Sequence, residues 1–367
     1  MSAITNELAI HHPGAKQHGV EECVIVSYRP VNPVSNDSDI VFQVNGTGRD
    51  YILLSDSKIY CQLRVLRADG DAVVAGDNVA FVNLSLHSLF RQVDISLNQQ
   101  IITSNIGVNY PYKAIFDVLL KYQHAMTECH LESAGFFKDQ AHAMDTIASN
   151  SGHLQRRALA QQGWVDFEGV LHMDVAQQPK AILNGVQLGV KLHQHDDSFR
   201  LISDGTEYTV EIKDAELRLC QLRVSPTVML AHSERLAKSP AVYPFYKSSV
   251  KAFAIPKGSF NWSIDDIFHG LVPNKLIVAF VSSAAYNGTL GTNPFNFRHF
   301  DLSYLEFARN SRSVPAPAFQ PKFTANTAVP GEYCSTGYVN SFLSLFNKRH
   351  SDNETNFIRR GDYPGEF

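Results

Sequence analysis

The sequence predicts an all-β protein built from two related β-sandwiches in tandem, with a few short helices. Three observations predict this fold. Apolar and polar residues alternate along several segments, as in strands with one buried and one solvated face. Turn dipeptides such as Asn45-Gly46 and Asp204-Gly205 recur along the chain. A seven-residue motif also occurs twice, once in each half.

Composition narrows the function classes. The chain has 367 residues, about two domains by the usual length prior. Its 44% hydrophobic content excludes disorder and collagen-like repeats, and its net charge of −4 disfavours a surface built to grip nucleic acid. Only 19% of residues are charged while Phe occurs 23 times, which favours a protein that buries area against partners.

The strands are expected where the alternation is clearest: residues 58–66, 91–97, 208–212 and 216–224. Residues 276–281 are continuously apolar and predict a fully buried strand. Helices are expected near 111–127, where Pro111 stands in the first turn, over 226–240, opened by Pro226, and over 338–346. A polar excursion covers 138–163, and its Arg156-Arg157 pair is interpreted as solvated surface.

The repeat suggests a duplication. Residues 90–96 (FRQVDIS) and 297–303 (FRHFDLS) are identical at four of seven positions, and each copy precedes a short helix. We therefore expect an N-terminal arm (1–20), a first sandwich (21–225), a connecting helix (226–240) and a second sandwich (241–367). Far fewer residues follow the helix in the second half than in the first, so the second sandwich is expected to be cut short.

The N-terminus and the cysteines indicate where the protein is made. Residues 1–20 lack the apolar core of a signal peptide, and no stretch is long and apolar enough for a membrane helix. The five cysteines are scattered and form no C-x-x-C pair, which disfavours structural zinc and a secreted disulfide framework. The sequence thus predicts synthesis in a reducing, intracellular setting.

Catalytic signatures are missing from the sequence. It contains no G-x-S-x-G elbow, no phosphate-binding G-x-x-x-x-G-K-[ST] loop and no dinucleotide-binding G-x-G-x-x-G turn. His193 and His195 alternate as metal ligands do on a cupin strand, but the glutamate that a cupin places a few residues later is absent. They are interpreted as two exposed histidines near a strand end, and we predict no enzyme, catalytic residue, metal or cofactor.

Rigid aromatic turns stand out instead. Candidate structural or interface anchors are the Tyr110-Pro111-Tyr112 turn and the pair Phe295 and Phe297, since such rings either plug loops or serve as anchors between subunits.

Several of these segments resemble a known family. Residues 78–83, 86–98 and 110–114 form one run that is similar to the hexon-type major capsid proteins of adintoviruses and the related Polinton (Maverick) elements. Shorter matches follow in order at 136–139, 183–186, 230–232, 286–288 and 293–297, so that the resemblance spans about residues 78–323. The polar stretch 140–163 has no counterpart in this pattern.

The resemblance implies a double jelly roll, meaning two eight-stranded sandwiches side by side, and no enzymatic activity. It further implies a pseudo-hexagonal homotrimer that tiles an icosahedral shell in the virion. The expected partners are copies of the chain itself, neighbouring capsomers, and penton and minor capsid proteins, with genome DNA met only indirectly and an inner membrane left undetermined. The residues alone leave two alternatives: a β-sandwich module that binds carbohydrate or protein, and a cupin-like metal enzyme using His193 and His195.

Overall fold

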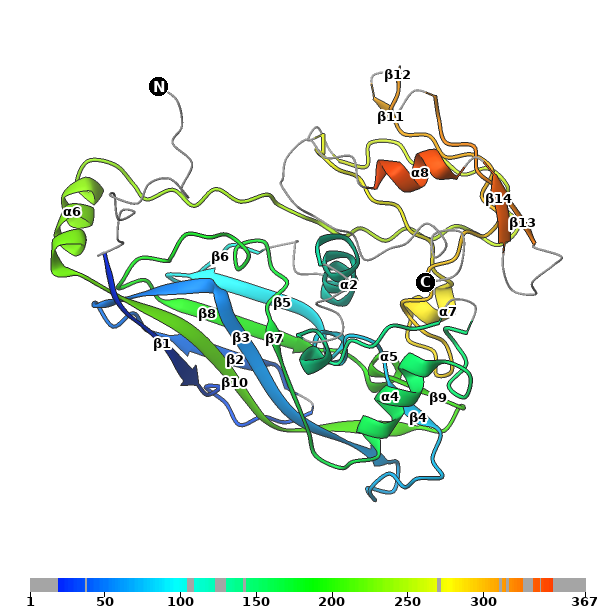
Figure 1. Cartoon of the computed structure of the whole chain (residues 1–367), viewed down its shortest axis with the longest axis horizontal. Coiled ribbons are helices and arrows are strands. Elements are labelled where there is room, and N and C mark those ends of the chain that lie inside the picture. The colour runs from blue at the N-terminus through cyan, green and yellow to red at the C-terminus, as the bar shows by residue number, and fades with distance from the viewer. Residues whose placement is uncertain are drawn as a thin grey trace, which may run out of the picture.

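The computed structural model describes residues 19–36, 38–103, 109–122, 130–140, 143–268, 272–309, 312–314, 317–325, 333–336 and 338–345. Most of its regular structure is strand, arranged in two four-stranded antiparallel sheets (Figure 1). The first sheet has the order β1 (Val20–Tyr28), β10 (Tyr208–Val224), β3 (Asp50–Arg67), β7 (Val165–Val170). The second has the order β2 (Ile40–Val44), β8 (Leu188–Gln194), β5 (Phe90–Leu97), β6 (Gln100–Ile101).

The eight strands are paired like nested brackets. β1 pairs with β10, β2 with β8, β3 with β7 and β5 with β6, all antiparallel. The pairs β10·β3 and β5·β8 then complete the two sheets. A long hairpin rolled up so that successive pairs fall in alternate sheets is the wiring of a jelly roll. The fold is therefore mostly β and jelly-roll-like.

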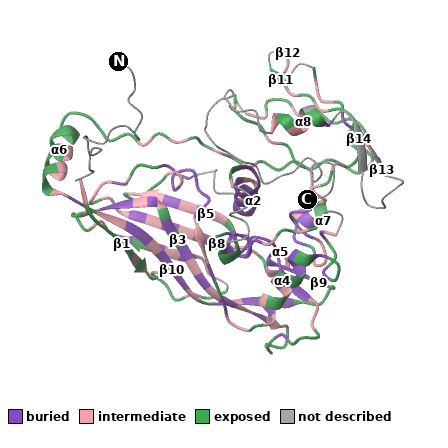
Figure 2. Cartoon of the chain, viewed as in Figure 1, coloured by how far each residue is buried: buried purple, intermediate pink, exposed green. Residues whose placement is uncertain are grey.

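The alternation in the sequence places one face of each sheet in a common core. Ile59, Cys61, Leu63 and Val65 of β3 are buried, and their neighbours on the strand are partly exposed. The buried residues of both sheets belong to one apolar cluster, which Figure 2 shows as the purple bands along the strands. The strands expected at 208–212 and 216–224 form the single strand β10, bent where its register against β3 shifts between Ile212 and Asp214.

Short helices lie at the edges of this sandwich. The expected helix near 111–127 begins at Tyr110 and ends at Lys121, and residues 123–129 lie outside the described part. The expected helices at 226–240 and 338–346 are shorter than predicted. The bounds are α1 (Ser85–Ser88), α2 (Tyr110–Lys121), the 3-10 helix η2 (Glu132–Ala134), α4 (Ser151–Ala160), α5 (Asp197–Arg200), α6 (Pro226–Leu236), α7 (Ser283–Tyr286) and α8 (Val339–Ser344).

Beyond α6 the described chain forms little sheet. Its strands are two hairpins, β11 (Ala308–Arg309) with β12 (Arg312–Ser313) and β13 (Lys322–Ala325) with β14 (Tyr333–Thr336). A third short pair, β4 (Val79–Phe81) with β9 (Leu201–Ser203), lies in the first half. Figure 1 shows the segment after α6 running extended past α2 to these hairpins.

One expected strand is wrong in this region, and the second copy of the repeat does not form a strand as the first copy does. Residues 276–281 are irregular, and Leu276 and Val278 are exposed. The second copy of the repeat, 297–303, is also irregular, although the first copy lies in β5. The two segments meet where Arg298 N donates to Phe280 O at 2.9 Å, but no ladder continues from that bond in the described residues. The backbone N–H and C=O groups of a strand need hydrogen-bond partners on a neighbouring strand, so an apolar segment without such a neighbour does not form a strand.

Gly135 provides a test of the packing around η2. It has a φ of 78°, and a Cβ there would lie 2.6 Å from Cβ of Ser85 and 2.9 Å from the Phe167 ring. Gly70 has a φ of 88° but nothing within 4 Å of such a Cβ. We expect Gly70→Ala to cost about 1 kcal/mol, for the backbone alone, and Gly135→Ala about 2–4 kcal/mol, because overpacking is added. Urea unfolding of both variants checks this; equal losses would contradict the crowding.

Candidate functional site

The predicted aromatic anchors meet at one face of α2. The Tyr112 ring lies 5.7 Å from the Tyr286 ring, 5.8 Å from the Phe295 ring and 6.2 Å from the Phe297 ring, measured between centroids. Phe297 also stacks on Phe116 at 5.1 Å. The structure thus brings Tyr112, Phe295 and Phe297 together, and through them the second half of the chain packs against the first.

The other two anchors point elsewhere. Pro111 is buried in the first turn of α2, where its missing N–H costs no hydrogen bond. The Tyr110 hydroxyl lies 2.8 Å from His87 Nδ1 and accepts from His172 N at 3.2 Å, on the side of α2 that faces the sandwich. Tyr110, Pro111, Tyr112 and Phe295 are buried within the chain itself. Their role as anchors between subunits stays a prediction.

A buried charge cluster joins α2 to Asp174, which follows β7 in the chain. Lys113 Nζ contacts Asp117 Oδ2 at 2.8 Å and Asp174 Oδ1 at 3.1 Å, and the lysine side chain is 3% exposed. Burial works against ionisation of Asp117, but its contacts with His172 and the charges of Lys113 and Lys121 outweigh it, so the pKa of this carboxyl is well below its usual value. Because buried charges are stable only when paired, Lys113 and its two carboxylates form one unit.

This cluster also reaches the second half. Asp174 accepts from Ser248 N at 2.6 Å and from Ser248 Oγ at 2.9 Å. The carboxylate therefore ties the extended segment after α6 to the sandwich.

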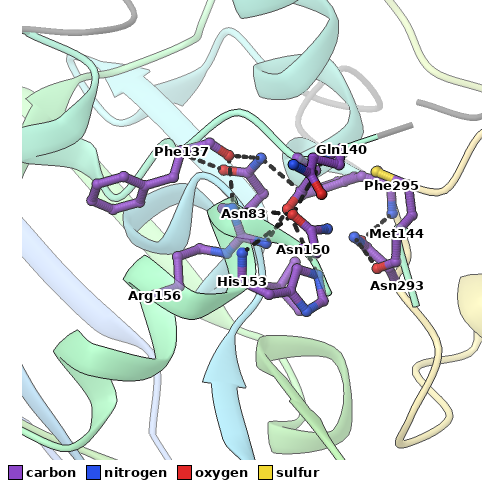
Figure 3. Close-up of polar contacts among 12 residues, drawn as sticks. Asn83, Phe137, Gln140, Met144, Asn150, His153, Arg156, Asn293 and Phe295 are labelled. Atoms are coloured by element: carbon purple, nitrogen blue, oxygen red, sulfur yellow. Dashed lines mark hydrogen bonds and ion pairs between the residues drawn. The ribbon is translucent and has the colours of Figure 1, made fainter. Parts of the chain in front are cut away.

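A second polar network surrounds Arg156, and Figure 3 shows its contacts. The guanidinium donates to Phe81 O at 2.9 Å, to Phe137 O at 3.0 Å and to Asp139 Oδ1 at 2.7 Å. Asn83 donates to Asp139 Oδ2 at 3.0 Å and to the same carbonyl of Phe137 at 2.8 Å. Arg156 is fully buried, so the interpretation of the Arg156-Arg157 pair as solvated surface is wrong for this residue.

The reason is the short helix α4 within the expected polar excursion. Asn150 caps α4 by accepting from Gly152 N at 3.1 Å, and it also accepts from Gln140 N at 3.2 Å. This cap orients the first turns of α4 so that Arg156 faces β4, while Arg157 stays half-buried and donates to Ala75 O at 3.3 Å. Sequence reasoning missed the network because the partners of Arg156, two backbone carbonyls and the Asp139 carboxylate, lie 17 to 75 residues away along the chain.

The same excursion holds the turn that contains Phe295. Asp145 accepts from Asn293 N at 2.7 Å and from Asn296 Nδ2 at 2.9 Å, and Asn293 Nδ2 donates to Met144 O at 3.2 Å. The Asn-Pro-Phe-Asn-Phe motif is thus fixed by its asparagines as well as by its rings.

The two histidines of the cupin alternative do not converge on a metal site. His193 lies between two carboxylates, 3.1 Å from Asp39 and 3.0 Å from Asp94. His195 stacks on Phe199 at 3.8 Å, and burial lowers its pKa to about 4. Both side chains are half-buried and partnered, so their interpretation as exposed histidines is wrong. Among the described residues, no group of three or more His, Cys, Asp or Glu side chains is placed to hold a metal ion.

The second half exposes a series of apolar side chains, which we call the apolar strip. Phe260 is 97% exposed. The strip follows the extended segment after α6, which Figure 2 shows mostly in green. Its members are Val242, Tyr246, Phe253, Phe260 and Trp262. Single exposed apolar residues are normal on a protein surface, whereas large contiguous apolar patches on monomers commonly mark interaction sites.

The chain was compared with known protein families and with curated protein sequences. No family model matches the chain. The chain is 22% identical over 299 residues to an uncharacterized protein of Caenorhabditis elegans, a match that covers 78% of this chain and 70% of that protein. No helix among the described residues combines the length and hydropathy of a membrane span.

Solved structures of low sequence identity also match. A chain of the cryo-EM structure of the Sputnik virophage aligns with a TM-score of 0.45 at 7% identity, covering 62% of this chain. The mavirus major capsid protein aligns with a TM-score of 0.33 at 11% identity, covering 60%, and the Faustovirus major capsid protein with 0.37 at 10%, covering 62%. This chain spans 53%, 50% and 58% of those three chains respectively.

The neighbouring arginines allow a matched test of the buried network. Arg156→Ala should cost about 3–5 kcal/mol of unfolding free energy, because it leaves Asp139 buried without its charge partner. Arg157→Ala should cost less than about 1 kcal/mol, since it loses one bond near the surface. Urea denaturation of the two variants measures the difference. Similar losses would contradict the assigned network.

His153 predicts a dependence of stability on pH. Its side chain is fully buried on α4, and burial, followed by the nearby charge of Arg156, lowers its pKa to about 4. An unfolded histidine has a pKa near 6.5, so between pH 6.5 and 4 the unfolded chain binds a proton that the folded chain does not. Stability therefore falls as the pH falls through this window, by about 2 kcal/mol at pH 5 from this group.

The corresponding experiment compares unfolding at pH 7 and pH 5. His153→Gln should reduce the acid-dependent loss, whereas the matched variant of an exposed histidine, His130→Gln, should leave it unchanged. If both variants retain the full loss, His153 is not the group responsible.

Proposed function

We propose that this chain is a capsid subunit, a viral or virus-derived major capsid protein that acts by self-association. The observation that carries the proposal is the nested pairing of the eight strands between Val20 and Val224, since jelly rolls of this wiring build many virus shells. The resemblance of residues 78–114 to hexon-type capsid proteins of adintoviruses and Polintons supports the same function. In this proposal the protein is not an enzyme and resides in the virion.

Two segments of the second half support a subunit that associates with further copies of itself. Residues 276–281 are continuously apolar, residues 297–303 repeat the sequence pattern of β5, and the two segments touch where Arg298 N donates to Phe280 O. In the proposal they belong to a second jelly roll over residues 241–367. Three copies with two rolls each would form the pseudo-hexagonal homotrimer that tiles an icosahedral shell, and penton and minor capsid proteins would complete it.

The apolar strip is the proposed contact surface. Subunit interfaces in permanent assemblies commonly bury about 2,000 Å² or more and resemble a core cut in half. Phe260 and Trp262 lie on a segment that the sandwich does not cover, which is where such an interface would find its aromatic anchors. The charged outer face of the first sheet, with pairs such as Arg64 and Glu211 at 2.6 Å, is suited to solvent instead.

The test is the oligomeric state of the whole chain. Size-exclusion chromatography with light scattering should give trimers or larger assemblies, and electron microscopy should show capsomers or shells. A monomer that persists at high concentration would contradict the proposal and favour the β-sandwich binding module.

A charge variant locates the contact surface. Phe260→Glu combined with Trp262→Glu should abolish assembly and leave the circular dichroism spectrum and melting temperature unchanged, because neither side chain supports the sandwich core. The matched control is Ile101→Glu, which also adds charge at an exposed apolar residue, but on the first half and outside the strip. Assembly blocked by both variants, or by neither, would argue against the strip as the interface.

A further inference from the structure

Two cysteines meet at the junction of the first and last strands of the jelly roll. Cys23 lies in β1 and Cys220 in β10, and the two are 197 residues apart in sequence. In the antiparallel register Cys23 stands opposite Leu222, and Ile25 stands opposite Cys220. The cysteines are thus diagonal neighbours on one face of the ladder. Their sulphur atoms are 3.1 Å apart, and both are free thiols.

The sulphur positions are close to those of a disulfide. A disulfide places its sulphurs about 2.05 Å apart, so the two sulphur atoms must approach by about 1 Å, and because the residues are diagonal neighbours the backbone of β1 must move with them. β1 can supply this movement because it is the edge strand of its sheet, with a neighbour on one side only, and because its register against β10 shifts between Val20 and Glu22. Cys23 is exposed and accessible to a reagent, whereas Cys220 beside it on the same face is buried.

We propose that Cys23 and Cys220 form a reversible disulfide that locks β1 onto β10 when the protein meets a small-molecule disulfide. The Cys23 thiolate attacks one sulphur of the small disulfide, and the other half leaves as a thiol. The Cys220 thiol then loses its proton and attacks the Cys23 sulphur, which releases the second small thiol. The protein loses two hydrogen atoms in total, and the small disulfide is reduced to two thiols. This inference stands apart from the proposed capsid function.

The surroundings of the two sulphurs assign their roles. Burial, together with the hydrogen bond to Cys23, raises the pKa of Cys220 to about 12, so this thiol is a poor first nucleophile. Cys23 therefore reacts first, and Cys220 resolves the mixed disulfide. Cys61 of β3 is fully buried and its pKa is also raised to about 12, so it provides an inert comparison within the same sheet.

The bond would have a large effect on the unfolded chain because it closes a very long loop, which is the condition under which a disulfide restricts the denatured state most. A reducing environment keeps the pair open. The protein would consequently be made with a mobile edge strand and would be stapled on transfer to oxidising surroundings.

The experiment uses the whole chain with glutathione disulfide as the probe. After incubation, remaining thiols are alkylated and the digest is mapped by mass spectrometry. We expect a peptide pair that links Cys23 to Cys220, and a melting temperature roughly 5–10 °C above that of the reduced sample, reversed by a reducing agent. Cys61→Ala should keep both effects, and Cys23→Ser and Cys220→Ala should each lose both.

Three results would contradict the proposed disulfide. Glutathione that stays attached to Cys23 after long incubation would overturn the proposal, and so would a link from Cys23 to Cys129 or Cys334. A linked protein that melts at the same temperature as the reduced form would exclude the role of the bond as a staple. The linked peptide pair is identified in a digest, so this readout does not depend on the oligomeric state, and the melting temperatures are compared at one protein concentration.

Discussion

The long antiparallel ladder between β3 and β10 is the constraint on which the rest of the structure depends. It runs from Tyr208 opposite Arg67 to Arg223 opposite Asp50. β10 holds the edge strand β1 on its other side, and β3 holds β7, so these two central strands fix the position of the whole first sheet. The apolar face that they share anchors the common core, and the second sheet packs against it.

The remainder of the chain is attached to this sandwich by buried polar groups as much as by apolar contact. Asp174 accepts from Ser248, and Asp145 accepts from Asn293 and Asn296, so two carboxylates of the first half hold two separate segments of the second. The rings of Tyr112, Phe295 and Phe297 add an apolar contact between the same two halves. Such contacts are directional, and they define the path of a segment that has no ladder of its own.

The sequence predicted what depends on local pattern. The alternation at 58–66 and 91–97 located β3 and β5, and the prolines located α2 and α6, because periodicity and missing N–H groups act within a few residues. It failed where the partner is distant. Arg156 resembles a surface residue in the sequence because its partner, the Phe81 carbonyl of β4, is distant along the chain. Residues 276–281 resemble a buried strand, but the sequence does not show that no neighbouring strand pairs with them in the described structure.

The nested pairing also determines when the fold can form. The innermost hairpin, β5 with β6, closes over a few residues, whereas β1 must wait for a partner that is made about 200 residues later. Contacts of such long sequence separation slow folding, since loop closure is costly before any contact rewards it. On a ribosome the first of these eight strands to emerge would therefore be the last of them to be paired, and a cell that makes this protein must protect that edge in the meantime.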